Sequence, residues 1–202
     1  MDYFLTDEQK MIVELGRKFA NEKIKPVREQ YEESEEFPWP VFHELAKSDL
    51  CGIYIPEEYG GFGKGVFDFC LLVEELSKID GAMALAIAAS ALGTHPIIHF
   101  GNEEQKKKYL PDIASGKKFV AFAITEPGAG SDVAAIQTNA VKTDKGDYIL
   151  NGTKCFITNA GEAEIYVTIA ITDKTKGIRG AGAFILEKGM PGFTFGKKEK
   201  KM

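Results

Sequence analysis

Residues 118–132 read KFVAFAITEPGAGSD, and the pattern of the whole chain changes at this stretch. Before it, apolar residues repeat at helical spacing, whereas after it glycines multiply and β-branched and aromatic residues alternate. We therefore predict a helical domain over residues 1–117 and a strand-rich domain over residues 118–202. Because helices and strands are segregated, the predicted fold class is α+β, an all-α bundle followed by an antiparallel β-barrel or sheet.

The helical part carries recognisable start and stop signals. Thr6 and Gln9 have the spacing of a capping box, so a helix should begin near Asp7 and bend or end at Pro26. The most apolar run, Gly81–Thr94, is shorter than the ~20 residues that a membrane-spanning helix needs. We interpret that run as a helix buried in a protein core. The tetrapeptide at residues 53–56 is expected to be extended.

The second part contains seven candidate strands. They are Phe119–Thr125, Thr138–Thr143, Asp147–Leu150, Lys154–Thr158, Glu164–Thr172, Gly182–Glu187 and Gly192–Gly196. Hairpin turns are predicted at Asp144-Lys145-Gly146 and at Asn151-Gly152. A sheet that stops near Gly196 would leave an open edge, so we expect further polypeptide or a partner chain to complete it.

Composition and charge exclude several classes of protein. Hydrophobic residues make up 44% of the chain, which is too high for intrinsic disorder, and the net charge of −5 disfavours nucleic-acid binding. The cysteines, Cys51, Cys70 and Cys155, are odd in number and widely spaced, which argues against a disulfide-stapled secreted domain. The acidic N-terminus lacks a signal-peptide pattern. We expect a cytoplasmic protein without membrane attachment, although a mature mitochondrial matrix protein would look the same.

A glycine turn follows the first predicted strand. In Thr125–Asp132, Gly128 and Gly130 allow a close approach of the backbone to a ligand, and successive N–H groups can form an anion-binding nest. The turn matches neither the dinucleotide fingerprint nor the Walker A loop. Any Pro-Gly turn between strands supplies similar residues, and the later segment Asn151–Gly161 could equally be an ordinary strand.

Taken together, these two segments resemble the acyl-CoA dehydrogenase family. Residues 123–135, AITEPGAGSDVAA, are similar to the family signature along their whole length. Three further stretches are similar to parts of that family: LTDEQ at 5–9 to its opening, YIPEEYGG at 54–61 to its first-domain loop, and GNEEQK at 101–106 with YLP at 109–111 to its last helix before the sheet. The resemblance covers essentially the whole chain and implies a helical domain followed by a β domain.

The resemblance implies FAD as cofactor. The residues that it places at the cofactor are Phe122, Ala123, Ile124, Thr125, Gly130, Ser131, Phe156, Ile157 and Thr158. Residues 122–125 should lie along the flavin, Gly130 and Ser131 should approach the pyrophosphate, and Ser131 should also approach the acyl-CoA. Thr158 is expected near the reactive flavin N5. Phe156 stands where a tryptophan is common in the family, and Phe122 where a tyrosine is frequent; both keep a flat apolar surface.

The implied reaction is α,β-dehydrogenation of an acyl-CoA thioester, with electrons passed to an electron-transferring flavoprotein. The family's catalytic glutamate lies in a C-terminal four-helix domain that is expected to be absent from this chain, so no catalytic residue is named. Glu126 is assigned to shaping the glycine turn, and Glu74 and Glu75 to structure. His95 and His99 are four residues apart, but no third ligand is evident and no metal site is expected.

The resemblance leaves the physiological role open. We expect a homo-oligomer, with a homotetramer as the specific form, and a role in fatty acid β-oxidation. Residues 88–94 are expected to line the acyl-tail pocket by resemblance. An acyl-CoA oxidase or a flavin monooxygenase of the same superfamily, or a non-catalytic subunit that binds flavin or acyl-CoA, would share these motifs.

Overall fold

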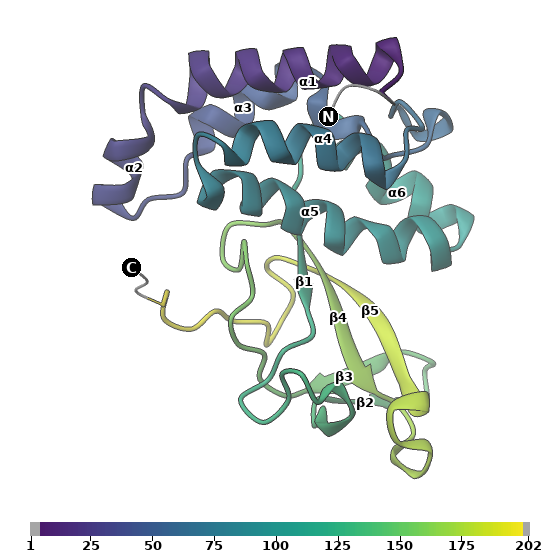
Figure 1. The fold of residues 1–202 in the computed structure, drawn as a ribbon. Coiled ribbons are helices and arrows are strands. Elements are labelled where there is room, and N and C mark those ends of the chain that lie inside the picture. Colours follow the sequence, from purple (N-terminus) through teal and green to yellow (C-terminus); the bar gives the residue numbers. More distant parts are fainter. Residues whose placement is uncertain (1–4, 200–202) are drawn as a thin grey trace. The chain divides into compact units, whose positions relative to one another are not determined.

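The computed structural model describes residues 5–199, which separate into two units. The helical unit ends at Phe119 and the sheet unit begins at Val120. Figure 1 shows that helices fill the first unit and strands the second. The prediction of the α+β class is therefore confirmed.

Six α-helices make up most of the helical unit. They are α1 (Asp7–Phe19), α2 (Arg28–Ser34), α3 (Trp39–Lys47), α4 (Val66–Ser77), α5 (Gly81–Phe100) and α6 (Glu103–Ala114). Helix α1 packs against α4, and α4 packs against α5 (Figure 1). The side chains that fill the space between the helices are fully buried: Phe42, Leu45, Leu72, Leu76, Ile97 and Leu110.

The helix ends follow the signals in the sequence. The Thr6 hydroxyl accepts from the Gln9 backbone N–H at 3.2 Å, and the Gln9 side chain accepts from the Thr6 N–H at 3.0 Å. This capping box starts α1 at Asp7, as predicted. After α1 a π-helical turn, Ala20–Ile24, leads to the break around Pro26. A second capping box, between Asn102 and Gln105, starts α6.

Helix α5 is longer than the sequence predicts. It continues past Thr94 and through Pro96 to Phe100, which makes 20 residues. By length and composition alone it could cross a membrane, but 56% of its most apolar window is buried inside the unit. A proline removes one intrahelical hydrogen bond, and the buried neighbours Thr94 and Ile97 hold the helix in place around it.

The sheet unit contains a mixed sheet rather than an antiparallel one. Its strands are β1 (Val120–Ala123), β2 (Asn139–Lys142), β3 (Tyr148–Asn151), β4 (Ile165–Ile171) and β5 (Ala181–Glu187). Strand β4 pairs in parallel with β1 and with the start of β2, whereas β2–β3 and β4–β5 are antiparallel. The wholly antiparallel prediction is wrong because the chain after β1 crosses over and enters β4 from the same end.

Some short predicted segments have other conformations. Residues 154–158 and 192–196 form no strand, and residues 53–56 form a turn instead of an extended segment. Consequently Asn151-Gly152 is no hairpin turn. The other predicted hairpin is confirmed, since β2 and β3 pair around Gly146, which has a φ of +90°.

Strand β4 forms the centre of the sheet unit. Its first four residues are buried on both faces, with Ile165 and Val167 only 1% exposed. The Tyr166 ring packs against Phe193 and Phe195, at centroid distances of 4.8 and 5.3 Å. This aromatic contact holds residues 192–196 against the strand without ladder hydrogen bonds.

Candidate functional site

The predicted glycine turn lies directly after β1. Two backbone hydrogen bonds close it: Glu126 N–H donates to Ala129 O at 3.0 Å, and Ala129 N–H donates to Glu126 O at 3.1 Å. Ala129 is buried in a small cluster with Ile136 and Ile171, so the base of the turn is anchored. Gly130 and Ser131, which follow, are exposed. The turn therefore presents backbone groups on a fixed base.

A buried ion pair lies beneath the turn. The Lys154 ammonium is 2.8 Å from Glu126 Oε1, and the two side chains are 10% and 6% exposed. The backbone N–H groups of Gln137 and Thr138 donate to the same carboxylate at 2.7 and 3.0 Å. Burial alone would raise the pKa of Glu126, but the hydrogen bonds from Lys154, Thr138 and Gln137 lower it to about 2.

The two segments predicted to bind one ligand are joined at consecutive residues. Lys154 Nζ donates to Ile124 O at 2.9 Å, and Cys155 N–H donates to Thr125 O at 3.0 Å. The end of the first segment is therefore tied to the start of the second. Thr125 and Phe156 are each adjacent to one of these bonds.

The predicted cofactor residues occupy different environments. Phe122 and Ala123 lie on β1, where Ala123 is buried and Phe122 is half-buried. Ile124 packs on the small cluster under the turn. Half-buried residues are Thr125, Ile157 and Thr158. Their roles stay predictions, but the chain presents all of them at the end of β1 or in the segment bonded to it.

Phe156 has an unusual backbone conformation. Its φ is +56°, a region that bulky residues rarely adopt, and its side chain is 68% exposed. A large exposed apolar ring in a strained conformation is typical of a position kept for contact with another molecule. This conformation also explains why residues 154–158 cannot form the predicted strand.

Unused hydrogen-bonding groups surround these segments. Within residues 5–199, no protein hydrogen bond reaches the hydroxyls of Thr125, Ser131 or Thr158, and the N–H groups of Gly130 and Ser131 have no protein acceptor. A Cβ added at Gly130 would meet nothing within 4 Å. The surface therefore offers donors and open space to a polar, anionic ligand.

Lys154 is the residue that the sequence reasoning missed. The sequence predicts only that Lys154 lies in a strand, whereas in the structure its side chain joins the two segments. A lysine two residues after an Asn-Gly pair, at the start of the apolar run at 155–157, was the available signal. A buried lysine needs a partner, and Glu126 supplies it.

Other candidate groups have structural partners. Glu75 is buried and accepts hydrogen bonds from Arg17, at 3.0 and 3.2 Å, and from Lys78, at 2.6 Å. The rings of His95 and His99 stack at 5.6 Å on α5. In the described part of the chain, no group of three or more His, Cys, Asp or Glu residues could hold a metal ion.

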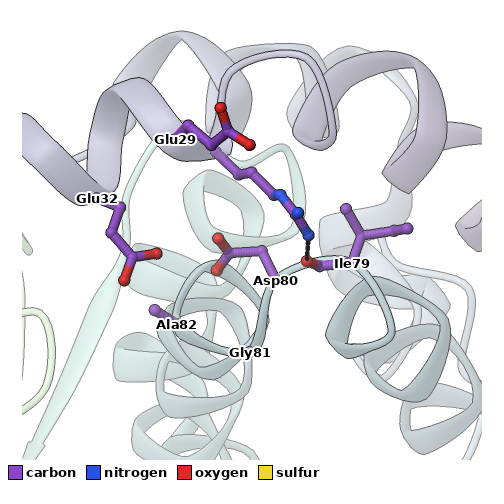
Figure 2. A pocket seen from close by; sticks show the side chains of 7 residues that line it. Glu29, Glu32, Ile79, Asp80, Gly81 and Ala82 are labelled. Carbon is purple, nitrogen blue, oxygen red and sulfur yellow. Dashed lines mark hydrogen bonds between the residues drawn. The ribbon is translucent and has the colours of Figure 1, made fainter. Parts of the chain in front are cut away.

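One recess of about 490 Å³ lies in the helical unit, between α2 and the start of α5. Figure 2 shows the carboxylates of Glu29, Glu32 and Asp80 around it. Arg28 donates to Ile79 O at 3.1 Å on one side. None of the predicted cofactor residues lines this recess, and its open, charged walls do not suit a flat apolar ring.

Two family models match the chain in sequence. The acyl-CoA dehydrogenase N-terminal domain matches residues 6–117, and the acyl-CoA dehydrogenase middle domain matches residues 121–202. The chain spans about half the length of the curated relatives it matches, 52% and 54% for two of them.

The chain is also similar to solved structures along nearly its whole length. Butyryl-CoA dehydrogenase from Megasphaera elsdenii is 44% identical, with a TM-score of 0.94 over 100% of this chain and 54% of that one. A chain in the structure of the electron-transferring flavoprotein of Acidaminococcus fermentans is 47% identical, with a TM-score of 0.94 over 100% of this chain and 53% of that one. An acyl-CoA dehydrogenase from Bacillus anthracis, complexed with FAD, is 38% identical, with a TM-score of 0.89 over 98% of this chain and 34% of that one.

Proposed function

This chain belongs to the acyl-CoA dehydrogenase family, and we propose that it forms the FAD-binding part of an enzyme that oxidises acyl-CoA thioesters to enoyl-CoA. One observation carries the proposal. The glycine turn and the segment at 156–158 are tied together by hydrogen bonds while their ligand-facing donors have no protein partner. A cofactor with an apolar ring and a pyrophosphate matches both properties.

The residues present fit FAD. The free N–H groups of Gly130 and Ser131 would receive the negatively charged pyrophosphate, and the hydroxyls of Thr125 and Thr158 would hydrogen-bond the polar edge of the ring. Phe156 and Phe122 supply flat apolar surface. When bound, the flavin supplies the capacity to accept a hydride from the β-carbon of the thioester.

The chain's own contribution is positioning. The fixed base of the glycine turn orients the Gly130 and Ser131 amides, and Phe156 limits the access of water to the ring face. The proton at the α-carbon must go to a base. Glu126 cannot take it, because both its oxygens already accept hydrogen bonds and its pKa is lowered to about 2. We therefore exclude Glu126 as that base.

Several finer features belong to the same proposal. The electron acceptor is an electron-transferring flavoprotein, and the enzyme works in fatty acid β-oxidation as a cytoplasmic homo-oligomer, most simply a homotetramer. The resemblance to the family supports the acceptor, the pathway and the oligomer, and the acidic N-terminus supports the location. An oxidase or a flavin monooxygenase of the same superfamily would reoxidise its flavin with oxygen. Oxygen consumption during turnover with butyryl-CoA separates these enzymes from the dehydrogenase.

The glycine turn allows a direct test of the proposal. Gly130→Val places its side chain in space that the protein leaves empty, so stability should change little while FAD uptake falls at least about tenfold. Gly81→Val, at another glycine with nothing within 4 Å, is the control and should bind FAD like the wild type. The measurements are flavin absorbance after gel filtration and the melting temperature. Stoichiometric FAD in Gly130→Val would refute the proposed site.

A further inference from the structure

Glu126 and Lys154 form a link between the two segments of the proposed flavin site. Lys154 Nζ has two acceptors, Ile124 O at 2.9 Å and Glu126 Oε1 at 2.8 Å. Because the next residue, Cys155, binds Thr125 O, two successive carbonyls of one segment are held by two successive residues of the other. The register between the segments is therefore fixed at two points.

The carboxylate extends this link to a third piece of chain. Both of its oxygens are used: Oε2 accepts from Gln137 N–H at 2.7 Å, and Oε1 accepts from Thr138 N–H at 3.0 Å and from Lys154. The ion pair thus connects the end of β1, the residues before β2 and the segment that follows β3. Each oxygen has a protein donor and the side chain is only 6% exposed, so the carboxylate serves the protein and not a ligand.

Stability alone does not explain such a pair. Removing two charges from water costs several kcal/mol each, and apolar residues of similar volume often stabilise a core equally well. A buried pair does, however, impose one geometry, because leaving either charge unpaired is strongly unfavourable. Glu126 directly follows Thr125, and Lys154 lies two residues before Phe156, so the pair fixes the geometry of both segments of the proposed site.

We propose that Glu126 and Lys154 are positioning residues for the flavin, setting the separation of the Thr125 and Thr158 segments without touching the cofactor. The proposal rests on the proposed function. It predicts that breaking the pair changes the environment of the flavin more than it changes the folding of the chain.

Glu126→Gln and Lys154→Met test this proposal in the purified protein at pH 7. Glu126→Gln keeps the shape and loses the charge, while Lys154→Met removes both hydrogen bonds to Ile124 and Glu126. Each should weaken FAD binding by about tenfold or more, since hydrogen bonds to charged groups exceed neutral ones, and should shift the visible spectrum of the bound flavin. Lys154→Arg keeps the charge and should retain most of the affinity.

Glu75→Gln is the matched control. Glu75 is also buried and also accepts from two cationic side chains, but it lies in the helical unit on α4. It should lower the melting temperature as much as Glu126→Gln does, yet leave the FAD dissociation constant and the flavin spectrum unchanged. Hydrogen exchange at the Cys155 amide gives a readout independent of FAD, and exchange should accelerate in Glu126→Gln and Lys154→Met only.

The outcomes are distinguishable. If the wild type takes up FAD, and Glu126→Gln and Lys154→Met bind it with the wild-type affinity and spectrum, the pair is only structural and this inference is wrong. If the wild type takes up no FAD, the proposed function itself fails. If one of the two variants does not fold, the FAD affinity and flavin spectrum of the other variant still decide the question.

Discussion

Among single residues, Gly152 is tightly constrained by a neighbour of the buried ion pair. A Cβ there would lie 2.6 Å from Thr138 Cβ and 2.7 Å from Thr138 Cα. The backbone of Gly152 therefore packs directly against Thr138. Thr138 also donates to Glu126. Gly152 therefore allows the close approach on which the buried ion pair depends.

We predict that Gly152→Ala destabilises the sheet unit by about 1–3 kcal/mol, because the new methyl group must push Thr138 away. Gly128→Ala, where a Cβ would meet nothing within 4 Å, should stay within about 0.5 kcal/mol of the wild type. Urea unfolding followed by hydrogen exchange of sheet amides measures both. Equal stability of the two variants would show that the contact relaxes freely.

The sequence predicted the residue types of the site better than their conformations. The motifs predict the turn with Gly130 and the hydroxyls of Thr125 and Thr158 as site residues. The Glu126 side chain accepts hydrogen bonds from Gln137 and Thr138, so it ties the turn to the residues before β2. The positive φ of Phe156 and the burial of Lys154 could not. Both depend on hydrogen bonds between segments about 30 residues apart, which no local pattern encodes.

Among the helices and strands, sequence signals predict a boundary correctly where the interacting residues lie within one helical turn. Capping boxes at Thr6 and Asn102 fix the starts of α1 and α6, because donor and acceptor lie three residues apart. The apolar run predicts a helix only as far as Thr94, but α5 continues through Pro96 to Phe100, because burial of its neighbours outweighs one missing hydrogen bond. The mixed pairing of β4 was also missed, because strand order depends on the path of the connections and not on strand composition.

The N-cap of α6 should contribute measurably to the stability of the helical unit. Asn102→Ala removes the acceptor of the Gln105 N–H, a bond of 2.8 Å, and should destabilise the helical unit by about 1 kcal/mol. Lys107→Ala, at an exposed position on the same helix, should change stability by less than about 0.5 kcal/mol. Chemical denaturation followed by Trp39 fluorescence reports on this unit. Indistinguishable midpoints for the two variants would contradict the role of the cap.

At the scale of the whole molecule, the two units can be followed separately. The chain has one tryptophan, Trp39, and it lies on α3 with its ring 5.6 Å from that of Phe119, inside the helical unit. Tyr148 and Tyr166 lie in the sheet unit. Tryptophan fluorescence and exchange of sheet amides therefore report on different cores, and a perturbation of one unit can be distinguished from global unfolding.

The buried ion pair should make the sheet unit sensitive to acid. The pKa of Glu126 falls from 4.5 in the unfolded chain to about 2 in the folded one, a difference that corresponds to about 3 kcal/mol. Because the folded pKa is the lower one, this stabilisation is fully present above pH 4.5 and is lost as the pH falls towards 2. In Glu126→Gln the stability of the sheet unit should be lower at pH 7 but should decline less between pH 7 and pH 3.

Urea unfolding at both pH values, followed by sheet-amide exchange, measures how steeply the stability of each protein declines with pH. Asp173→Asn, which alters a half-buried carboxylate of the same unit, should leave most of the wild-type slope. Equal slopes in wild type and Glu126→Gln would show that the buried pair does not govern acid unfolding.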